Sequence, residues 1–93
     1  MSDDNKIIIT VSGADKVGIV ANVTAILAKN HVNIEDIKQT LMQGHFVMFM
    51  LCDIKNCTLT FKELKNELIE EGNKMETEIW IQKKGIFEKM HTV

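Results

Sequence analysis

The sequence contains no arginine: all eleven of its basic residues are lysines, and they are scattered among thirteen acidic residues. Nucleic-acid-binding surfaces use arginine to read base edges and clustered positive charge to hold the phosphate backbone. We therefore expect no direct binding of nucleic acid. A carboxylate ligand would also have to be held without a bidentate guanidinium, by backbone amides, a lysine or an amide side chain.

The chain also lacks proline, internal repeats, low-complexity segments and linkers. No apolar run approaches the roughly 20 residues of a membrane span, and the polar start MSDDNK does not have the basic-then-apolar layout of a signal peptide. Cysteine is scarce, and without a secretion signal Cys52 and Cys57 are expected to be reduced thiols, one in a strand and one in a loop. These absences predict a cytoplasmic protein that does not bind or cross a membrane.

What is present is the composition of one globular domain. The 93 residues are 45% hydrophobic and 26% charged, which suits a single core but not a large enclosed active site. We expect one domain over residues 1–93, with a core from 6 to 83 and an apolar tail from 84 to 93.

Hydrophobic periodicity predicts four strands and two helices. The strands are expected at Lys6–Ser12, Asn33–Met42, Phe46–Cys52 and Lys74–Gln82. The second strand does not keep a strict period of two, so we expect a bulge near Glu35 and Asp36. A turn at Gln43–His45 joins it to the third strand.

Capping residues mark the two helices. Asp15 is expected to cap the first helix, which ends near Asn30 with that residue in a left-handed conformation. The second helix begins at a capping box of Thr60 and Glu63 and is expected to stop at Gly72.

The order βαββαβ predicts an α+β fold of the ferredoxin-like type, a sandwich of a four-stranded antiparallel sheet with both helices on one face. The other face would stay open, yet the strand at 46–52 is apolar on both faces and Trp80 lies on the polar phase of the last strand. Because an uncovered apolar face usually marks an interaction site, we expect a homodimer, whose subunits meet either edge to edge in one continuous sheet or face to face over the sheets. The tail is expected to help cover this face with Ile86, Phe87 and Met90.

The bend between the first strand and the first helix, GADKVG at 13–18, is the candidate site. A phosphate-binding loop would follow Gly18 with lysine and then serine or threonine, whereas Ile19 and Val20 stand there. The G-x-G pair of a dinucleotide fingerprint is missing as well. A nucleotide site is therefore excluded at this bend.

Two segments resemble the signature of the ACT domain, a small-molecule-binding regulatory module. They are DKVGIV at the bend, similar to the family's D-x-P-G-I-V, and NIEDIKQ in the second expected strand, similar to N-I-x-D-I-x-Q. The resemblance extends from Ile7 to Gln82, and Val17 stands where many members have proline. It is strongest to free-standing, single-domain ACT proteins, which include relatives of the glycine-cleavage-system repressor.

The resemblance implies a ligand site shared by two subunits. Members of the family typically bind an amino acid between the bend of one subunit and the start of the second strand of the other. The matching positions are Asp15, Lys16, Val17, Gly18, Ile19 and Val20 on one subunit and Asn33 and Ile34 on the other. Free amides at a helix N-terminus attract a carboxylate, Gly18 would let a ligand approach the backbone, and Asn33 offers a donor and an acceptor.

Two functional hypotheses follow. The first is a domain that senses an amino acid or a similar small molecule as a homodimer and regulates a partner protein, without catalysis and without a cofactor. The second is a protein-interaction or dimerisation module without a ligand, in which Asp15 only caps the helix. No metal site is expected, because His31, His45 and His91 lack the spacing of metal ligands.

Overall fold

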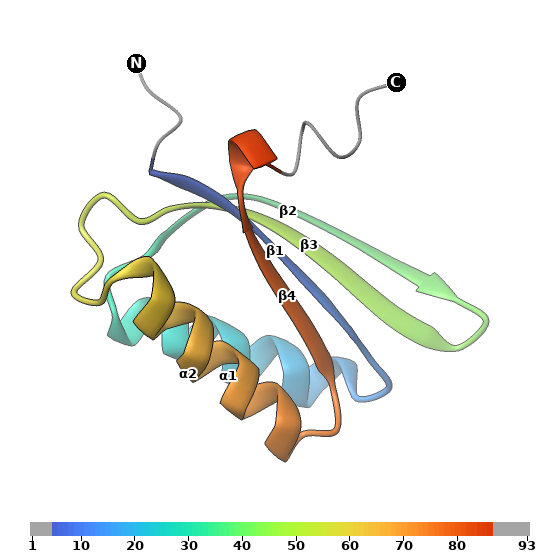
Figure 1. The fold of residues 1–93 in the computed structure, drawn as a ribbon. Helices are drawn as coiled ribbons and strands as arrows, with labels where there is room; N and C mark the ends of the chain where they lie inside the picture. Colours follow the sequence, from blue (N-terminus) through green and yellow to red (C-terminus); the bar gives the residue numbers. More distant parts are fainter. Residues whose placement is uncertain (1–4, 87–93) are drawn as a thin grey trace.

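The computed structural model describes residues 5–86, which form two layers (Figure 1). One layer is an antiparallel sheet in the order β2-β3-β1-β4, built from β1 (Lys6–Gly13), β2 (Asn33–Met42), β3 (His45–Asp53) and β4 (Glu78–Lys83). The other layer consists of α1 (Lys16–Lys29) and α2 (Phe61–Lys74), which lie on the same face of the sheet. The predicted ferredoxin-like α+β fold is confirmed.

The core fills the space between the helices and the sheet. Alternate residues of the two central strands point toward the helices, as the period of a strand requires. The residues without solvent exposure include Ile7, Ile9, Val11, Met48 and Met50 from the sheet and Ile19, Val23, Leu64 and Leu68 from the helices. Burying each such side chain contributes about 1.5–3 kcal/mol to the free energy of folding, so the core between the two layers supplies most of the stability.

A bulge sets the two faces of β2. The pairing with β3 shifts between Ile34 and Asp36, which leaves Glu35 as the extra residue. As a result both Ile34 and Ile37 lie on the helix side of the sheet, since Ile37 pairs with the buried Met50. The predicted bulge is therefore confirmed.

The hairpin between β2 and β3 closes at Gln43 and Gly44, which have φ values of 54° and 80°. Positive φ at both central residues is the signature of a type I′ turn, whose twist matches that of the flanking strands. The predicted turn is confirmed, and it fixes the register of the hairpin.

Both helices begin at the predicted caps. The Asp15 Oδ1 accepts a hydrogen bond of 3.0 Å from the Gly18 backbone N–H. At α2, the Thr60 hydroxyl accepts from the Glu63 N–H, and the Glu63 carboxylate accepts from the Thr60 N–H. These side chains satisfy backbone donors that the first turn of a helix leaves free.

The ends of both helices differ from the predictions. The left-handed residue after α1 is His31, at φ 61°, rather than Asn30, at φ −99°. The helix α2 runs on to Lys74 rather than stopping at Gly72, and the left-handed residue after it is Glu76, at φ 54°. Both ends are Schellman motifs with a residue other than glycine at the left-handed position. The predictions relied on Asn30 and on Gly72, and neither takes that position.

Gly72 has a packing role instead. A Cβ atom there would lie 2.7 Å from the Thr77 backbone oxygen and 3.0 Å from the Ile79 side chain. The Thr77 N–H donates back to the Gly72 carbonyl at 2.8 Å, which closes the loop between α2 and β4. That loop occupies the first residues of the predicted strand, so β4 begins at Glu78 rather than at Lys74.

The face of the sheet opposite the helices carries apolar side chains in a row across three strands. Phe49 of β3 and Trp80 of β4 both pair with Thr10 of β1, and they are 40% and 49% exposed. Of the tail residues predicted to cover this face, Ile86 is 55% exposed, and Phe87 and Met90 lie outside the described residues. That cover stays a prediction.

Candidate functional site

The predicted site residues at the bend divide by their exposure. Asp15, Lys16 and Val17 are exposed, and Gly18 and Val20 are half-buried. The Ile19 side chain has no solvent exposure and belongs to the core. The surface that a ligand can touch is therefore formed by Lys16, Val17 and Val20, with Asp15 beside them.

The space next to Gly18 is already occupied by the chain itself. A Cβ atom on Gly18 would lie 2.5 Å from the Asp15 Oδ2. The glycine lets the capping carboxylate fold over the first turn of α1, and a ligand approaching this backbone meets that carboxylate first. The close approach predicted from Gly18 is thus made by Asp15.

The two parts of the predicted site lie at opposite ends of the sheet. The bend follows Gly13, which pairs with Phe46, whereas Asn33 pairs with Asp53 beside Lys6. Seven strand residues separate the two ends, which is about 23 Å at 3.3 Å per residue. One chain does not bring Asn33 and Ile34 to its own bend.

A groove does lie beside the bend, between α1 and β2. It has a volume of about 440 Å³ and is lined by Lys16, Val17, Val20, Ala21 and Gln39.

A second hollow of about 200 Å³ adjoins the groove. It shares Lys16 and Gln39 with it and is lined further by Thr40, Leu41 and Phe46. The two hollows together are called the α1–β2 groove below. Its β2 residues were not predicted as site residues: Gln39 ends the motif NIEDIKQ but the resemblance implied only Asn33 and Ile34 there, and Thr40 and Leu41 follow the motif.

The groove exists because the helices do not cover the outer part of β2. All but one of the ten residues of β2 are exposed, and the exception, Ile34, is half-buried. Ile37 and Leu41 lie on the helix side yet are 40% and 67% exposed. Figure 1 shows the turn end of the β2–β3 hairpin projecting beyond the helices.

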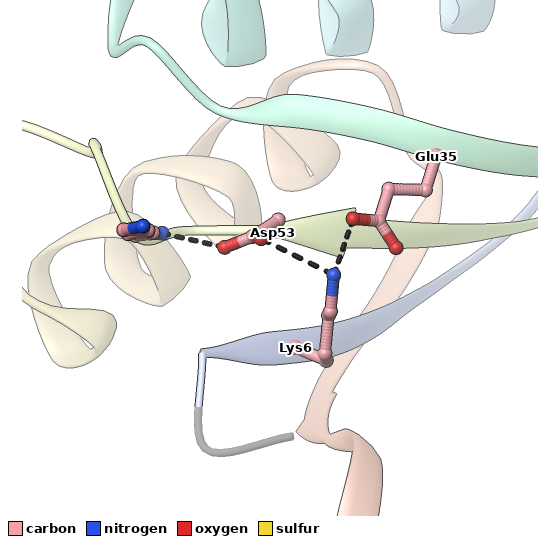
Figure 2. A network of polar contacts seen from close by, with 4 residues as sticks. Lys6, Glu35 and Asp53 are labelled. Atoms are coloured by element: carbon pink, nitrogen blue, oxygen red, sulfur yellow. Dashed lines mark hydrogen bonds and ion pairs between the residues drawn. The ribbon is translucent and has the colours of Figure 1, made fainter. Parts of the chain in front are cut away.

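An ionic network holds the start of β2 at the other end of the sheet. The Lys6 ammonium lies between the carboxylates of Glu35 and Asp53 and bridges three strands (Figure 2). The hydrogen bond to Glu35 is the main cause that raises the pKa of Lys6. The hydrogen bond from the Lys55 backbone N–H, followed by that from Lys6, lowers the pKa of Asp53. The network thereby anchors the bulge residue Glu35, two positions after Asn33.

The two cysteines differ in their surroundings. Burial raises the pKa of the Cys52 thiol to about 12, so it stays protonated in the core. Cys57 lies in the loop before α2, and both cysteines are free thiols, in the places predicted. Within residues 5–86, no three metal-binding side chains come together, and neither helix is long and apolar enough to span a membrane.

Comparison with known proteins gives a consistent result. The sequence profile of the ACT domain matches residues 5–82. A UPF0237 protein of Clostridium acetobutylicum is 50% identical over 88 residues, which cover 95% of this chain and 99% of that protein.

Solved structures agree. An ACT domain protein from Streptococcus pneumoniae is 40% identical and superposes with a TM-score of 0.77, over 89% of this chain and 93% of that one. A putative glycine cleavage system transcriptional repressor superposes with a TM-score of 0.73 over 83% of this chain and 45% of that one. Because the two sequences are only 12% identical, this likeness shows a shared fold alone.

Proposed function

We propose that this chain, which belongs to the ACT domain family, is a regulatory domain that binds an amino acid between two copies of itself and thereby controls a partner protein. Members of the family typically bind such ligands between subunits, as the resemblance implied. The observation that carries the proposal is the separation of the two motifs that resemble the ACT signature: the bend and the start of β2 lie about 23 Å apart in one chain. Only a second copy can bring the partner's start of β2 to the bend.

The topology supports one way of pairing the copies. Within residues 5–86 the strand β2 is an edge of the sheet, so its outer backbone N–H and C=O groups have no neighbouring strand in that part of the chain. It runs parallel to β1, because both are antiparallel to β3. If two β2 edges pair in antiparallel fashion, the start of one β2 lies beside the end of the other, next to the bend. Asn33 and Ile34 of one copy then approach Lys16, Val17 and Val20 of the other.

A ligand in such a site acts by linkage. A molecule that contacts both copies binds the dimer more tightly than the monomer, so it stabilises the dimer by mass action. The change in dimer stability is the signal that a partner protein reads. This mechanism needs neither a cofactor nor a catalytic group, in keeping with the expectation that the protein is not an enzyme.

The proposal is tested by measuring thermal unfolding and sedimentation of the full chain with each standard amino acid. A ligand present at a hundred times its dissociation constant adds about 2.7 kcal/mol of stability and shifts the monomer–dimer equilibrium toward the dimer. A chain that shows neither effect with any amino acid at millimolar concentration is not an amino-acid sensor.

The open face of the sheet favours a second candidate, a protein-interaction module. Phe49 and Trp80 are large, half-exposed side chains on one face, and a hollow of about 200 Å³ lies beside Phe49, between Ile8 and Lys38. Aromatic side chains of this kind dominate protein interfaces. This candidate predicts a chain that dimerises or binds a protein through the open face and whose stability no amino acid changes.

A further inference from the structure

We infer that the α1–β2 groove selects a short aliphatic α-amino acid, with the ligand carboxylate at Lys16 and the aliphatic side chain against Val20 and Leu41. The inference rests on the proposed function and adds the chemical class of the ligand and the residue that holds its charge. It is carried by the make-up of the groove: one cation, a primary amide, one threonine, one aromatic ring and four aliphatic side chains in two adjoining hollows.

Lys16 is the charged residue among those that line the two hollows, and it lines both. Its Nζ lies 5.8 Å from the centre of the Phe46 ring, within the range of a cation–π contact. That contact holds the ammonium beside the groove while leaving its N–H donors available. Because the chain has no arginine, a lysine is the charged side chain that can bind a carboxylate here.

The side chains that line the groove determine which ligand side chain it can accept. Val17, Val20, Ala21 and Leu41 offer methyl groups and no hydrogen-bonding side chain. A volume of about 440 Å³ lies near the lower end of the range for small-molecule pockets, about 300–1,000 Å³. A side chain of valine, leucine or isoleucine size meets matching apolar surface, whereas a second carboxylate finds no second cation and a basic side chain is repelled by Lys16.

Gln39 provides a polar contact that is common to both hollows, beside Thr40 in the smaller one. Like Lys16 it lines both hollows, and its side-chain carbonyl can accept a hydrogen bond from the ligand ammonium. A ligand that lies across the groove thus has its carboxylate at α1 and its ammonium toward β2. The same position faces the edge at which the second copy is proposed to bind.

The test compares three probes on the full chain: leucine, 4-methylpentanoate, which lacks the ammonium, and leucinamide, which lacks the carboxylate. Binding is measured by calorimetry and located by amide chemical shifts of the ¹⁵N-labelled protein. The variant Lys16→Gln removes the cation, Lys16→Arg restores it, and Lys65→Gln on α2 removes a charge far from the groove. Because Lys16 and Lys65 are both exposed, the variants should fold, which the dispersion of the same spectra verifies.

We expect leucine to shift the amide signals of Lys16, Val20 and Gln39. Leucine should bind about tenfold or more weakly to Lys16→Gln than to the unaltered chain. Its affinity should recover in Lys16→Arg and should not change in Lys65→Gln. Leucinamide should bind at least as weakly as leucine binds to Lys16→Gln. If leucine binds but leucinamide binds equally well, or Lys16→Gln is unaffected, the inference is overturned while the proposed function stands.

The experiment also recognises a failure of the proposed function in which the role of Lys16 is retained. Binding of 4-methylpentanoate that depends on Lys16, with no binding of any amino acid, would support the role of Lys16 and overturn the amino-acid part of both proposals. Binding of none of the three probes would overturn the inference, whereas the proposed function is decided by the screen of all standard amino acids described above.

Discussion

The neighbouring strands β3 and β2 differ in how far their helix-side residues are exposed to solvent. On the helix side of β3, Met50 and Phe46 are 0% and 1% exposed. Their register partners on β2, Ile37 and Leu41, are 40% and 67% exposed. The side chains are equally apolar, so the difference comes from the position of the helices and not from the sequence of the strand.

This difference separates the part of the molecule that folds the chain from the part that remains available for binding. The helices cover β1, β3 and β4 but leave the outer part of β2 open beside the first turn of α1. A long, exposed, apolar edge strand is an association surface unless charge or a bulge protects it. Here the bulge and two acidic residues lie at the start of β2, and Lys38 shares the open face with Phe49, so the helix side of the later part of the strand carries no charged side chain.

The sharpest test of the comparison is a pair of matched truncations. We expect Met50→Ala to lower the free energy of unfolding by about 2–5 kcal/mol, because it opens a cavity in a fully buried site. The matched variant Ile37→Ala, at the paired position of β2, should lower the free energy of unfolding of the monomer by less than about 1 kcal/mol. Urea unfolding at low protein concentration measures both.

Ile37→Ala should nevertheless weaken dimerisation, which sedimentation at several concentrations measures. Equal losses of monomer stability from the two variants would contradict the division between covered and uncovered strands. A normal dimer constant for Ile37→Ala would move the association surface away from β2.

A second test lies at the first turn of α1, where the covered and uncovered regions meet. The variant Gly18→Val displaces the Asp15 carboxylate and should cost about 0.5–2 kcal/mol through loss of the cap. Because the same turn carries Lys16 and Val17, which line the groove, it should also abolish amino-acid binding while leaving a dimer. Thr60→Ala is the matched control, because it removes the equivalent cap on α2 without touching the bend.

Calorimetric titration separates the two effects of this substitution. Thr60→Ala should lose similar stability and keep full affinity. If Gly18→Val binds an amino acid as tightly as the unaltered chain does, the bend is not the ligand site.

A third variant changes the loop after α2, away from the α1–β2 groove. Glu76 has a φ of 54°, in the left-handed region that costs a residue with a side chain about 1–2 kcal/mol. We expect Glu76→Gly to raise the free energy of unfolding by up to about 1 kcal/mol, since glycine relieves this strain but loses more entropy on folding. Ligand affinity should not change, and a change in it would show that the two regions are coupled.

The smallest expected effect concerns the network at the start of β2. The folded pKa of Asp53 is below its ordinary value of 3.8, so this group stabilises the fold above that value and loses its contribution as pH falls through the folded pKa. The pKa of Lys6 is raised above 10.5, so its contribution is present below that value and is lost as pH rises through the folded pKa. We expect Lys6→Met to reduce both dependences.

The acid dependence should be reduced rather than abolished, because the backbone hydrogen bond from Lys55 still lowers the pKa of Asp53. Chemical unfolding as a function of pH measures the effect. An unchanged pH profile in Lys6→Met would mean that the network does not contribute to stability.

Local signals in the sequence predicted most of the fold. Asp15, Thr60 and Glu63 have the side chains that cap helices, and the irregular alternation around Glu35 revealed the bulge. The helix ends were predicted less well, because His31 and Glu76 take left-handed positions without being glycine.

The candidate site was predictable only in part. Lys16, Val17 and Val20 were found from the motif at the bend, whereas Gln39 and Leu41 were not. Their role depends on how far the helices extend over the sheet, which is a property of the tertiary structure and leaves no mark on the alternation of β2.

The most direct test of the central claim asks whether the bend of one copy meets the start of β2 of another. Two proteins are prepared in a Cys57→Ser background, one with Val17→Cys and one with Asn33→Cys, both at exposed positions. Each alone and an equal mixture are treated with a short bis-maleimide, and covalent dimers are measured by mass spectrometry. The account predicts a linked dimer in the mixture that is far more abundant than in either protein alone and that increases with a bound amino acid. A mixture that dimerises in sedimentation but yields no Val17–Asn33 linkage would contradict it.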